Sequence, residues 1–176
     1  TSIPNRKILN EIGYMGQIDA LYESLTAREN LVFFGNLMGL DGDKLKQAID
    51  KNMKLVNLEN ELHQIVNTFS GGMKRRLSLA ITLLSNPNLI ILDEPTVGID
   101  PSRRKDIWKQ LNLLTEENKS VIVTTHVMGE AERCDYIGLI MEGRLFTMGT
   151  PKELKEKFGV NSIEEVFIKA ETEAQS

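Results

Sequence analysis

Hydrophobic and polar residues alternate with helical periodicity in the first half of the chain. Between residues 26 and 84, apolar residues recur every three or four positions, a spacing that predicts amphipathic helices. Thr26 to Glu29 has the form of a capping box, so we expect a first helix to begin there and to end at Gly39. A second helix is expected from about Asp43. The whole region from 26 to 84 is therefore predicted to be helical.

From Pro87 onward the helical spacing of apolar residues gives way to short apolar runs. Leu89 to Leu92 and Val121 to Thr124 have the length of buried strands, and an amphipathic helix is predicted between them, near 102–118. Glu11 to Met15 predicts an earlier buried strand that runs into a loop at Gly16. Because strands that alternate with helices usually pair in parallel, the sequence predicts an α/β fold with a parallel sheet.

The last forty residues predict a hairpin followed by helices. Residues 136–141 and 144–148 are apolar runs joined by a Glu-Gly turn, which is typical of a hairpin. Thr150 followed by proline predicts the start of a helix that ends at Gly159. Residues 161–170 are predicted to add a last helix, and the polar tail from Glu171 to be mobile.

Composition narrows the class of protein. With 176 residues and 41% hydrophobic content, the chain can bury a core and corresponds to one domain or most of one. The net charge of −4 is spread along the sequence, so no nucleic-acid partner is expected. Cys134 is the single cysteine, and no secretory leader pattern is present at the start, which favours a cytosolic compartment. The apolar runs are far shorter than the roughly 20 residues that cross a bilayer, so any membrane span is expected to come from a partner.

The strongest chemical pattern lies between residues 70 and 101. Ser-Gly-Gly-Met-Lys at 70–74 precedes Leu-Ile-Ile-Leu-Asp-Glu-Pro at 89–95 by one helix length, and Thr-Val-Gly-Ile-Asp-Pro follows at 96–101. The order and spacing of these segments resemble the ATP-binding cassette (ABC) ATPases, in which they are the signature motif, the Walker B strand and the D-loop. The resemblance implies a P-loop NTPase (RecA-like) parallel sheet core with an inserted α-helical subdomain.

Two acidic residues end the predicted Walker B strand. Burial of an apolar strand fixes carboxylates that emerge at its carboxyl end, and the resemblance assigns Mg²⁺ binding to Asp93 and orientation of the attacking water to Glu94. The alternative is an ordinary strand that ends in two solvated acids. Pro95 and the following Gly98 and Asp100 favour the catalytic interpretation.

The diglycine begins the next candidate site. The run from Met73 to Leu84 is amphipathic, so the backbone amides before it would point out of a helix N-terminus and form an anion site. The resemblance implies that Ser70, Gly71, Gly72 and Met73 bind the γ-phosphate of a nucleotide held mainly by the opposite subunit. A plain helix N-cap is the alternative. Phe69 and Met73 replace the leucine and glutamine of the commonest family form.

Three further residues gain roles only from the resemblance. Gln17 matches the Q-loop, where it would sense metal-bound water and the coupling surface, so it is a candidate for both the nucleotide and the metal site. His126 stands in the place of the switch histidine, as a catalytic contact to the γ-phosphate. Asp100 matches the D-loop, which lines the dimer interface. The alternatives are a solvated glutamine, a structural histidine and a turn aspartate before Pro101.

No segment matches the P-loop pattern Gly-x-x-x-x-Gly-Lys-Ser/Thr. Gly138 and Gly143 have the right spacing, but Arg144 and Leu145 follow them. In the family the P-loop lies upstream of the Q-loop, so the resemblance implies a domain that is N-terminally truncated before the Q-loop. Because the P-loop strand is expected beside the Walker B strand, we expect an uncovered apolar edge there.

The resemblance also divides the chain into four parts. Residues 1–17 would be a remnant of the nucleotide-binding core, 18–85 the helical subdomain with the signature motif, 86–150 the rest of the core, and 151–176 a C-terminal helical extension and tail.

The function implied by the resemblance is the ATP-binding and ATP-hydrolysing subunit of an ABC transporter. ATP and Mg²⁺ would be its cofactors, and its partners a second ABC ATPase subunit, in a homo- or heterodimer, and a transmembrane permease subunit at the cytoplasmic face of the cell membrane. Residues 21–30, 73–76 and 149–154 resemble the exporter branch, which moves drugs, lipids or polysaccharides. The chain alone is expected to be inactive.

Two alternatives remain open on the sequence. One is a soluble ABC ATPase of DNA repair or translation, although the chain has neither a coiled-coil insertion nor a charged linker between cassettes. The other is a non-catalytic, degenerate cassette. Retention of Asp93, Glu94, His126 and the glycines argues against it.

Overall fold

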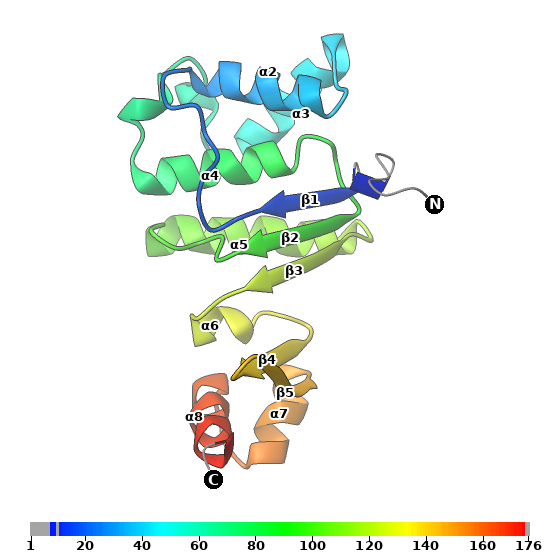
Figure 1. The fold of residues 1–176 in the computed structure, drawn as a ribbon, viewed down its shortest axis with the longest axis vertical. Helices are drawn as coiled ribbons and strands as arrows, with labels where there is room; N and C mark the ends of the chain where they lie inside the picture. Colours follow the sequence, from blue (N-terminus) through cyan, green and yellow to red (C-terminus); the bar gives the residue numbers. More distant parts are fainter. Residues whose placement is uncertain (1–7, 10, 175–176) are drawn as a thin grey trace. The chain divides into compact units, whose positions relative to one another are not determined.

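The computed structural model describes residues 8–9 and 11–174, and the chain divides into two compact units, residues 1–124 and 125–176. The first unit combines helices with a parallel sheet, and the second packs helices against a β-hairpin (Figure 1). Within the part of the chain that the structure describes, no helix has both the length and the apolar character needed to span a membrane.

The first unit begins with strand β1 and continues through a helical region. Its elements are β1 (Ile12–Met15), α2 (Ala27–Leu37), α3 (Gly42–Leu55), the short 3₁₀ turns η1 (Glu59–Glu61) and η2 (Val66–Thr68), and α4 (Gly71–Thr82). The predicted capping box at the start of α2 is confirmed, because Thr26 accepts from the amide of Glu29 and the Glu29 side chain accepts from the amide of Thr26.

The prediction that residues 26–84 are wholly helical is wrong for the segment between α3 and α4. Asn57 adopts a left-handed backbone conformation with φ of 53°, which ends the helical course of the chain after α3. The chain then turns back, and Ile65 forms a β-bridge with Thr26. Residues 56–70 therefore lead the chain back to the start of α2.

Three parallel strands form the sheet of the first unit. After α4 come β2 (Leu89–Asp93), α5 (Pro101–Glu116) and β3 (Ser120–Thr124), and the strand order is β1-β2-β3 with parallel pairing throughout. This arrangement confirms the predicted α/β fold. The expectation of an uncovered edge beside the Walker B strand is wrong, because β1 and β3 pair with both edges of β2 and make it the central strand.

The two faces of this sheet differ in burial. Ile90 and Leu92 of β2 are fully buried on the face where α4 contacts β1 and α5 contacts β3. On the other face, Tyr14 and Ile122 lie in one register row with Ile91 and are 65% and 52% exposed. The prediction of a buried Walker B strand is thus confirmed for one face of β2, which is sufficient to anchor its carboxyl end.

We expect Gly13→Ala to destabilise the first unit. A Cβ atom at Gly13 would lie 2.8 Å from Cγ of Pro87 and 2.8 Å from the carbonyl oxygen of Thr82, and the latter is backbone that cannot rotate away. Overpacking of this kind costs about 1–3 kcal/mol. Urea unfolding of the variant checks the value. Gly129→Ala is the matched control, since that glycine is helical and has open space around it, and a shift as large as that of Gly13→Ala would contradict the packing argument.

The second unit is built around a hairpin. It contains α6 (Met128–Ala131), β4 (Ile137–Met141), β5 (Arg144–Gly149), α7 (Pro151–Phe158) and α8 (Ile163–Ala174), with β4 and β5 antiparallel. The predicted start and end of α7 are confirmed by a capping box at Thr150 and a left-handed Gly159. The tail predicted to be mobile from Glu171 is helical as far as Ala174, because Val166 and Ala170 anchor α8 in the core of this unit.

Candidate functional site

The carboxyl end of β2 carries the two predicted acids. Asp93 is the last residue of the strand, and its carboxylate accepts a hydrogen bond from the hydroxyl of Thr124 at the end of β3. The amide of Glu94 donates to the carbonyl oxygen of Thr124 over 3.1 Å. Both acids are partly exposed. The end of the neighbouring strand therefore holds this pair at the sheet's carboxyl edge.

Glu94 has an uncommon backbone conformation. Its φ is 48°, in the left-handed region, where a residue with a Cβ atom is strained by roughly 1–3 kcal/mol. The structure must stabilise this conformation through surrounding contacts. One contact of its side chain is with Gln17, whose Nε2 donates to Oε2 of Glu94 at 3.4 Å. The structure thus brings together two residues that lie 77 positions apart in the sequence.

The signature segment begins α4. Ser70 is the N-cap, and its hydroxyl oxygen accepts from the amide of Met73 over 3.3 Å. Gly71 is exposed and has open space around its Cα, whereas a Cβ atom at Gly72 would lie 3.1 Å from the carbonyl oxygen of Gly98. The plain N-cap role of Ser70 is therefore present in the structure. Binding of an anion at the start of this helix stays a prediction.

Asp100 occupies the N-cap position of α5. Its carboxylate accepts from the hydroxyl of Ser102 at 2.6 Å and from the amide of Arg103 at 3.0 Å. The hydrogen bond from Ser102, followed by that from Arg103, holds the pKa of Asp100 below its usual value, so the group is ionised at neutral pH. This capping role is local. The place of Asp100 in a dimer interface stays a prediction.

His126 lies in the second unit, in the turn between β3 and α6, and its side chain is exposed. The turn is held by its neighbours: Thr125 Oγ1 accepts from the amide of Val127 at 3.0 Å and donates to Glu130 Oε2 at 2.8 Å. Glu130 is only 2% exposed. The backbone around His126 is therefore well anchored, and its contact with a γ-phosphate stays a prediction.

Arg75 is a residue that the sequence did not single out. It lies in α4, one turn after Gly71, and is 5% exposed. Its guanidinium donates to four backbone carbonyls, those of Gly16, Gln17, Asp93 and Glu94. A signal was available in the sequence, because Arg75 precedes buried Leu79 by four positions and Thr82 by seven, which places a charge on the apolar face of the helix.

The side chains at the carboxyl end of β2 fit a magnesium ion. Mg²⁺ is bound by one or two carboxylates together with water and phosphate oxygens. Asp93 supplies a carboxylate at the edge of the sheet, and the Gln17 side chain approaches the adjacent Glu94. When bound, the ion would neutralise charge on the phosphates. Asp93 and Gln17 are the residues that would hold it, directly or through water.

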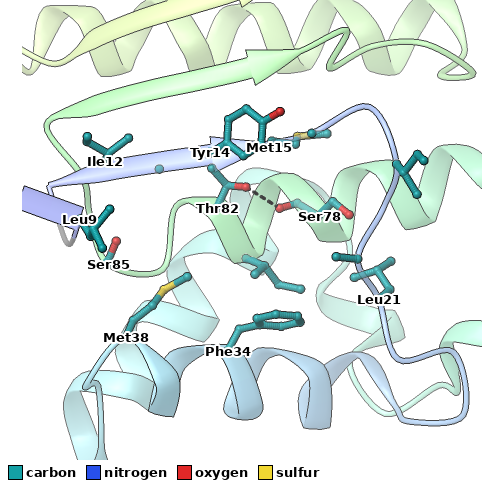
Figure 2. A pocket seen from close by; sticks show the side chains of 15 residues that line it. Leu9, Ile12, Tyr14, Met15, Leu21, Phe34, Met38, Ser78, Thr82 and Ser85 are labelled. Carbon is teal, nitrogen blue, oxygen red and sulfur yellow. Dashed lines mark hydrogen bonds between the residues drawn. The ribbon is translucent and has the colours of Figure 1, made fainter. Parts of the chain in front are cut away.

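A pocket of about 310 Å³ lies beside the loop that carries Gln17. Figure 2 shows residues that line it, among them Tyr14 of β1, Phe34 of α2 and Thr82 of α4. The lining is mainly apolar, and Ile18 at its rim is 87% exposed. An apolar pocket next to a candidate catalytic loop is a place where a second polypeptide can contact the site.

Comparison with known proteins shows the family of the chain. The family profile of ABC transporters matches residues 2–97. ABC transporter A family members 4 and 7 of Arabidopsis thaliana are 43% and 42% identical to the chain over 156 residues, which are 87% of the chain and 16% and 17% of those proteins. The chain thus spans about one sixth of the length of these relatives.

Two solved structures show the same fold. The ATP-binding subunit of an ABC transporter superposes with a TM-score of 0.83 at 26% identity, covering 94% of this chain and 70% of that one. CbiO1 from Clostridium perfringens, part of the ABC transporter complex cbiONQ, superposes with a TM-score of 0.74 at 29% identity, covering 86% of this chain and 61% of that one. The chain therefore belongs to the ABC transporter family, and its fold is that of the family's ATP-binding subunits.

Proposed function

We propose that this chain is the part of a transporter's ATPase that carries the hydrolytic carboxylate and the signature motif, and that ATP hydrolysis there drives export through a transmembrane partner. The observation that carries the proposal is the meeting of Gln17, Asp93 and Glu94 at the carboxyl edge of the sheet, where parallel α/β folds bind their ligands. The export direction is supported by the resemblance of residues 21–30, 73–76 and 149–154 to exporters.

Each residue has a separate task in the proposed reaction. Glu94 accepts a hydrogen bond from Gln17, and its carboxylate is proposed to orient a water for attack on the γ-phosphorus. Asp93 holds the metal ion. Gln17 links the nucleotide-dependent state of Asp93 and Glu94 to the protein surface beside its own loop. Ser70, Gly71, Gly72 and Met73 supply hydrogen-bond donors to a γ-phosphate bound by a second subunit, and Asp100 lies near the contact between the two.

The proposal of a second ATPase subunit is supported by the exposure of the signature segment. Ser70 and Gly71 are exposed at the start of α4, and the backbone beside Gly72 is that of Gly98 in the D-loop. Donors that face outward act on a nucleotide only when another subunit presents it. We therefore propose a homo- or heterodimer with two nucleotides between its subunits, and His126 as an additional contact to the γ-phosphate.

The transmembrane permease partner is proposed to dock at the pocket beside Gln17. Ile18 and Tyr14 expose apolar surface there, and Phe34 from α2 continues it. An apolar segment of the permease would bury this surface and contact the loop of Gln17 directly. We propose that this docking holds the ATPase at the cytoplasmic face of the membrane, with nucleotide state and transport linked through one loop.

We expect the 176-residue chain by itself to bind ATP weakly and to hydrolyse none, because it contains no P-loop pattern to hold the triphosphate. The complete protein is expected to hydrolyse ATP. Isothermal titration of ATP–Mg²⁺ into each, together with phosphate release, tests the difference. Saturable micromolar binding with turnover by the 176-residue chain would contradict this part of the proposal, and absence of turnover in the complete protein would contradict the ATPase function.

A further inference from the structure

We propose that Arg75 is a positioning residue that aligns Gln17 with Glu94 and links both to the helix of the signature motif. The inference builds on the proposed ATPase function and concerns a residue outside the predicted site. Arg75 does not contact the reacting atoms. It acts through backbone groups of the residues that do.

The guanidinium of Arg75 joins two loops that are distant in the sequence. Nη1 donates to the carbonyl oxygens of Gly16 at 2.7 Å and Gln17 at 3.1 Å. Nη2 donates to the carbonyl oxygen of Glu94 at 2.9 Å and also to that of Asp93. One side chain therefore holds the loop after β1 and the loop after β2 at the same time.

An arginine suits this position for reasons of shape and charge. Its planar fork presents donors in fixed directions and stays protonated, whereas a lysine ammonium is a compact group that cannot reach two pairs of carbonyls from one place. Asp19 lies 3.2 Å from Nη1 and balances the buried charge. Without such a partner, the charge of a side chain that is 94% buried would be costly to hold there.

Arg75 fixes both sides of the contact between Gln17 and Glu94. The left-handed backbone of Glu94 is held at its amide by Thr124 and at its carbonyl by Arg75. The backbone of Gln17 is held by the same guanidinium, while its side chain donates to the Glu94 carboxylate. Loss of the fork would free both backbones, and the glutamine and the carboxylate would lose their mutual alignment.

Because Arg75 lies in α4, it can couple the two nucleotide sites of a dimer. Arg75 lies one helical turn after Gly71, which is proposed to face the γ-phosphate presented by the opposite subunit. A displacement of α4 on engagement of that phosphate moves the guanidinium, and with it the carbonyls of Gln17 and Glu94. The signature contact with one nucleotide is thereby coupled to the hydrolytic carboxylate of the other.

Arg76 provides a matched control for this inference. It is the next residue of α4, and its Nη1 also donates to two backbone carbonyls, those of Val56 at 2.8 Å and Asn57 at 2.9 Å. These acceptors lie at the end of α3, away from Gln17 and Glu94. Arg75→Lys and Arg76→Lys therefore remove the same type of interaction from adjacent positions of one helix.

The experiment compares the two variants in the complete protein by hydrogen–deuterium exchange and by ATPase kinetics. Arg75→Lys is expected to speed exchange in residues 16–20 and 94–98 and to lower kcat at least about tenfold with KM changed less than about twofold, as expected for misaligned groups. Arg76→Lys is expected to speed exchange only near residues 56–58 and to leave kcat within about twofold. Melting temperatures establish that both variants are folded at the assay temperature.

Two results would overturn the inference: unchanged exchange in residues 16–20 and 94–98 of Arg75→Lys, or equal losses of kcat in the two variants. The proposed function is tested separately, by the wild-type protein. If the wild type shows no turnover while Arg75→Lys speeds exchange in both loops, the ATPase proposal fails, and the structural link through Arg75 stands.

Discussion

Glu94→Gln is expected to lower the kcat for ATP hydrolysis by the complete protein at least about a hundredfold, the size typical of a lost general base. The amide keeps the volume of the side chain and can still accept the hydrogen bond from Gln17, but it no longer polarises a water through a carboxylate. Affinity for ATP should change little, because Glu94 is not proposed to hold the phosphates. Phosphate release and nucleotide binding measure the two effects separately.

Glu116→Gln is the control for this substitution. Glu116 is an exposed acid at the end of α5, and neutralising it removes the same charge without touching the sheet edge. Its turnover should equal that of the wild type. Retention of more than about a third of the wild-type rate in Glu94→Gln would assign the water-activating role to another residue.

Gly71→Asp is expected to lower turnover strongly while the fold is retained. Gly71 has open space around it, so the new side chain fits, and an acid in the first turn of a helix is favourable with respect to the helix dipole. The same carboxylate would lie at the surface proposed to receive a γ-phosphate and would repel it. We expect a fall in kcat of at least about tenfold, since one like charge beside a phosphate costs more than 1.4 kcal/mol.

Gly71→Asn separates charge from size at this position. Asparagine has nearly the volume of aspartate and carries no charge, so its kcat should lie between those of Gly71→Asp and the wild type. Thermal melting of both variants checks the fold. If Gly71→Asp were folded and as active as the wild type, the start of α4 would not face a phosphate during the reaction.

Much of the fold follows from local signals in the sequence. The capping box at Thr26 and the threonine–proline pair at 150–151 predicted the starts of α2 and α7, because capping signals join residues only a few positions apart. The apolar runs predicted β2 and β3, and their separation by a helix predicted parallel pairing, since such strands are joined by crossovers. These features depend on neighbouring residues, which a single sequence displays directly.

Features that depend on distant contacts were not predictable in the same way. The central position of β2 and the bridge between Thr26 and Ile65 result from pairing across the fold, which no local pattern records. Arg75 belongs to the same class, because its acceptors are carbonyl groups that every residue possesses. The sequence showed a charge on an apolar helix face, and only the fold shows which backbone groups it meets.

The roles of the site residues were predicted from resemblance, and those roles stay predictions. Gln17 and Glu94 lie together in the structure, and their shared catalytic task stays a prediction. Ser70 and Asp100 are helix N-caps, and this local role accounts for part of their chemistry whatever their contact with nucleotide. Their action on phosphate and at a dimer contact remains a prediction, because it requires groups from a second subunit.

The measurement that tests the central claim most directly is the ATP-dependent association of the complete ATP-binding domain that carries Glu94→Gln. Sedimentation velocity with and without ATP–Mg²⁺ reports the assembly of two subunits around uncleaved nucleotide. The account predicts a dimer with ATP, a monomer without it, and loss of the ATP-dependent dimer when Gly71→Asp is added. A domain that binds ATP and stays monomeric, or a dimer indifferent to the charge at Gly71, would contradict a shared site between the signature helix and the nucleotide of a second subunit.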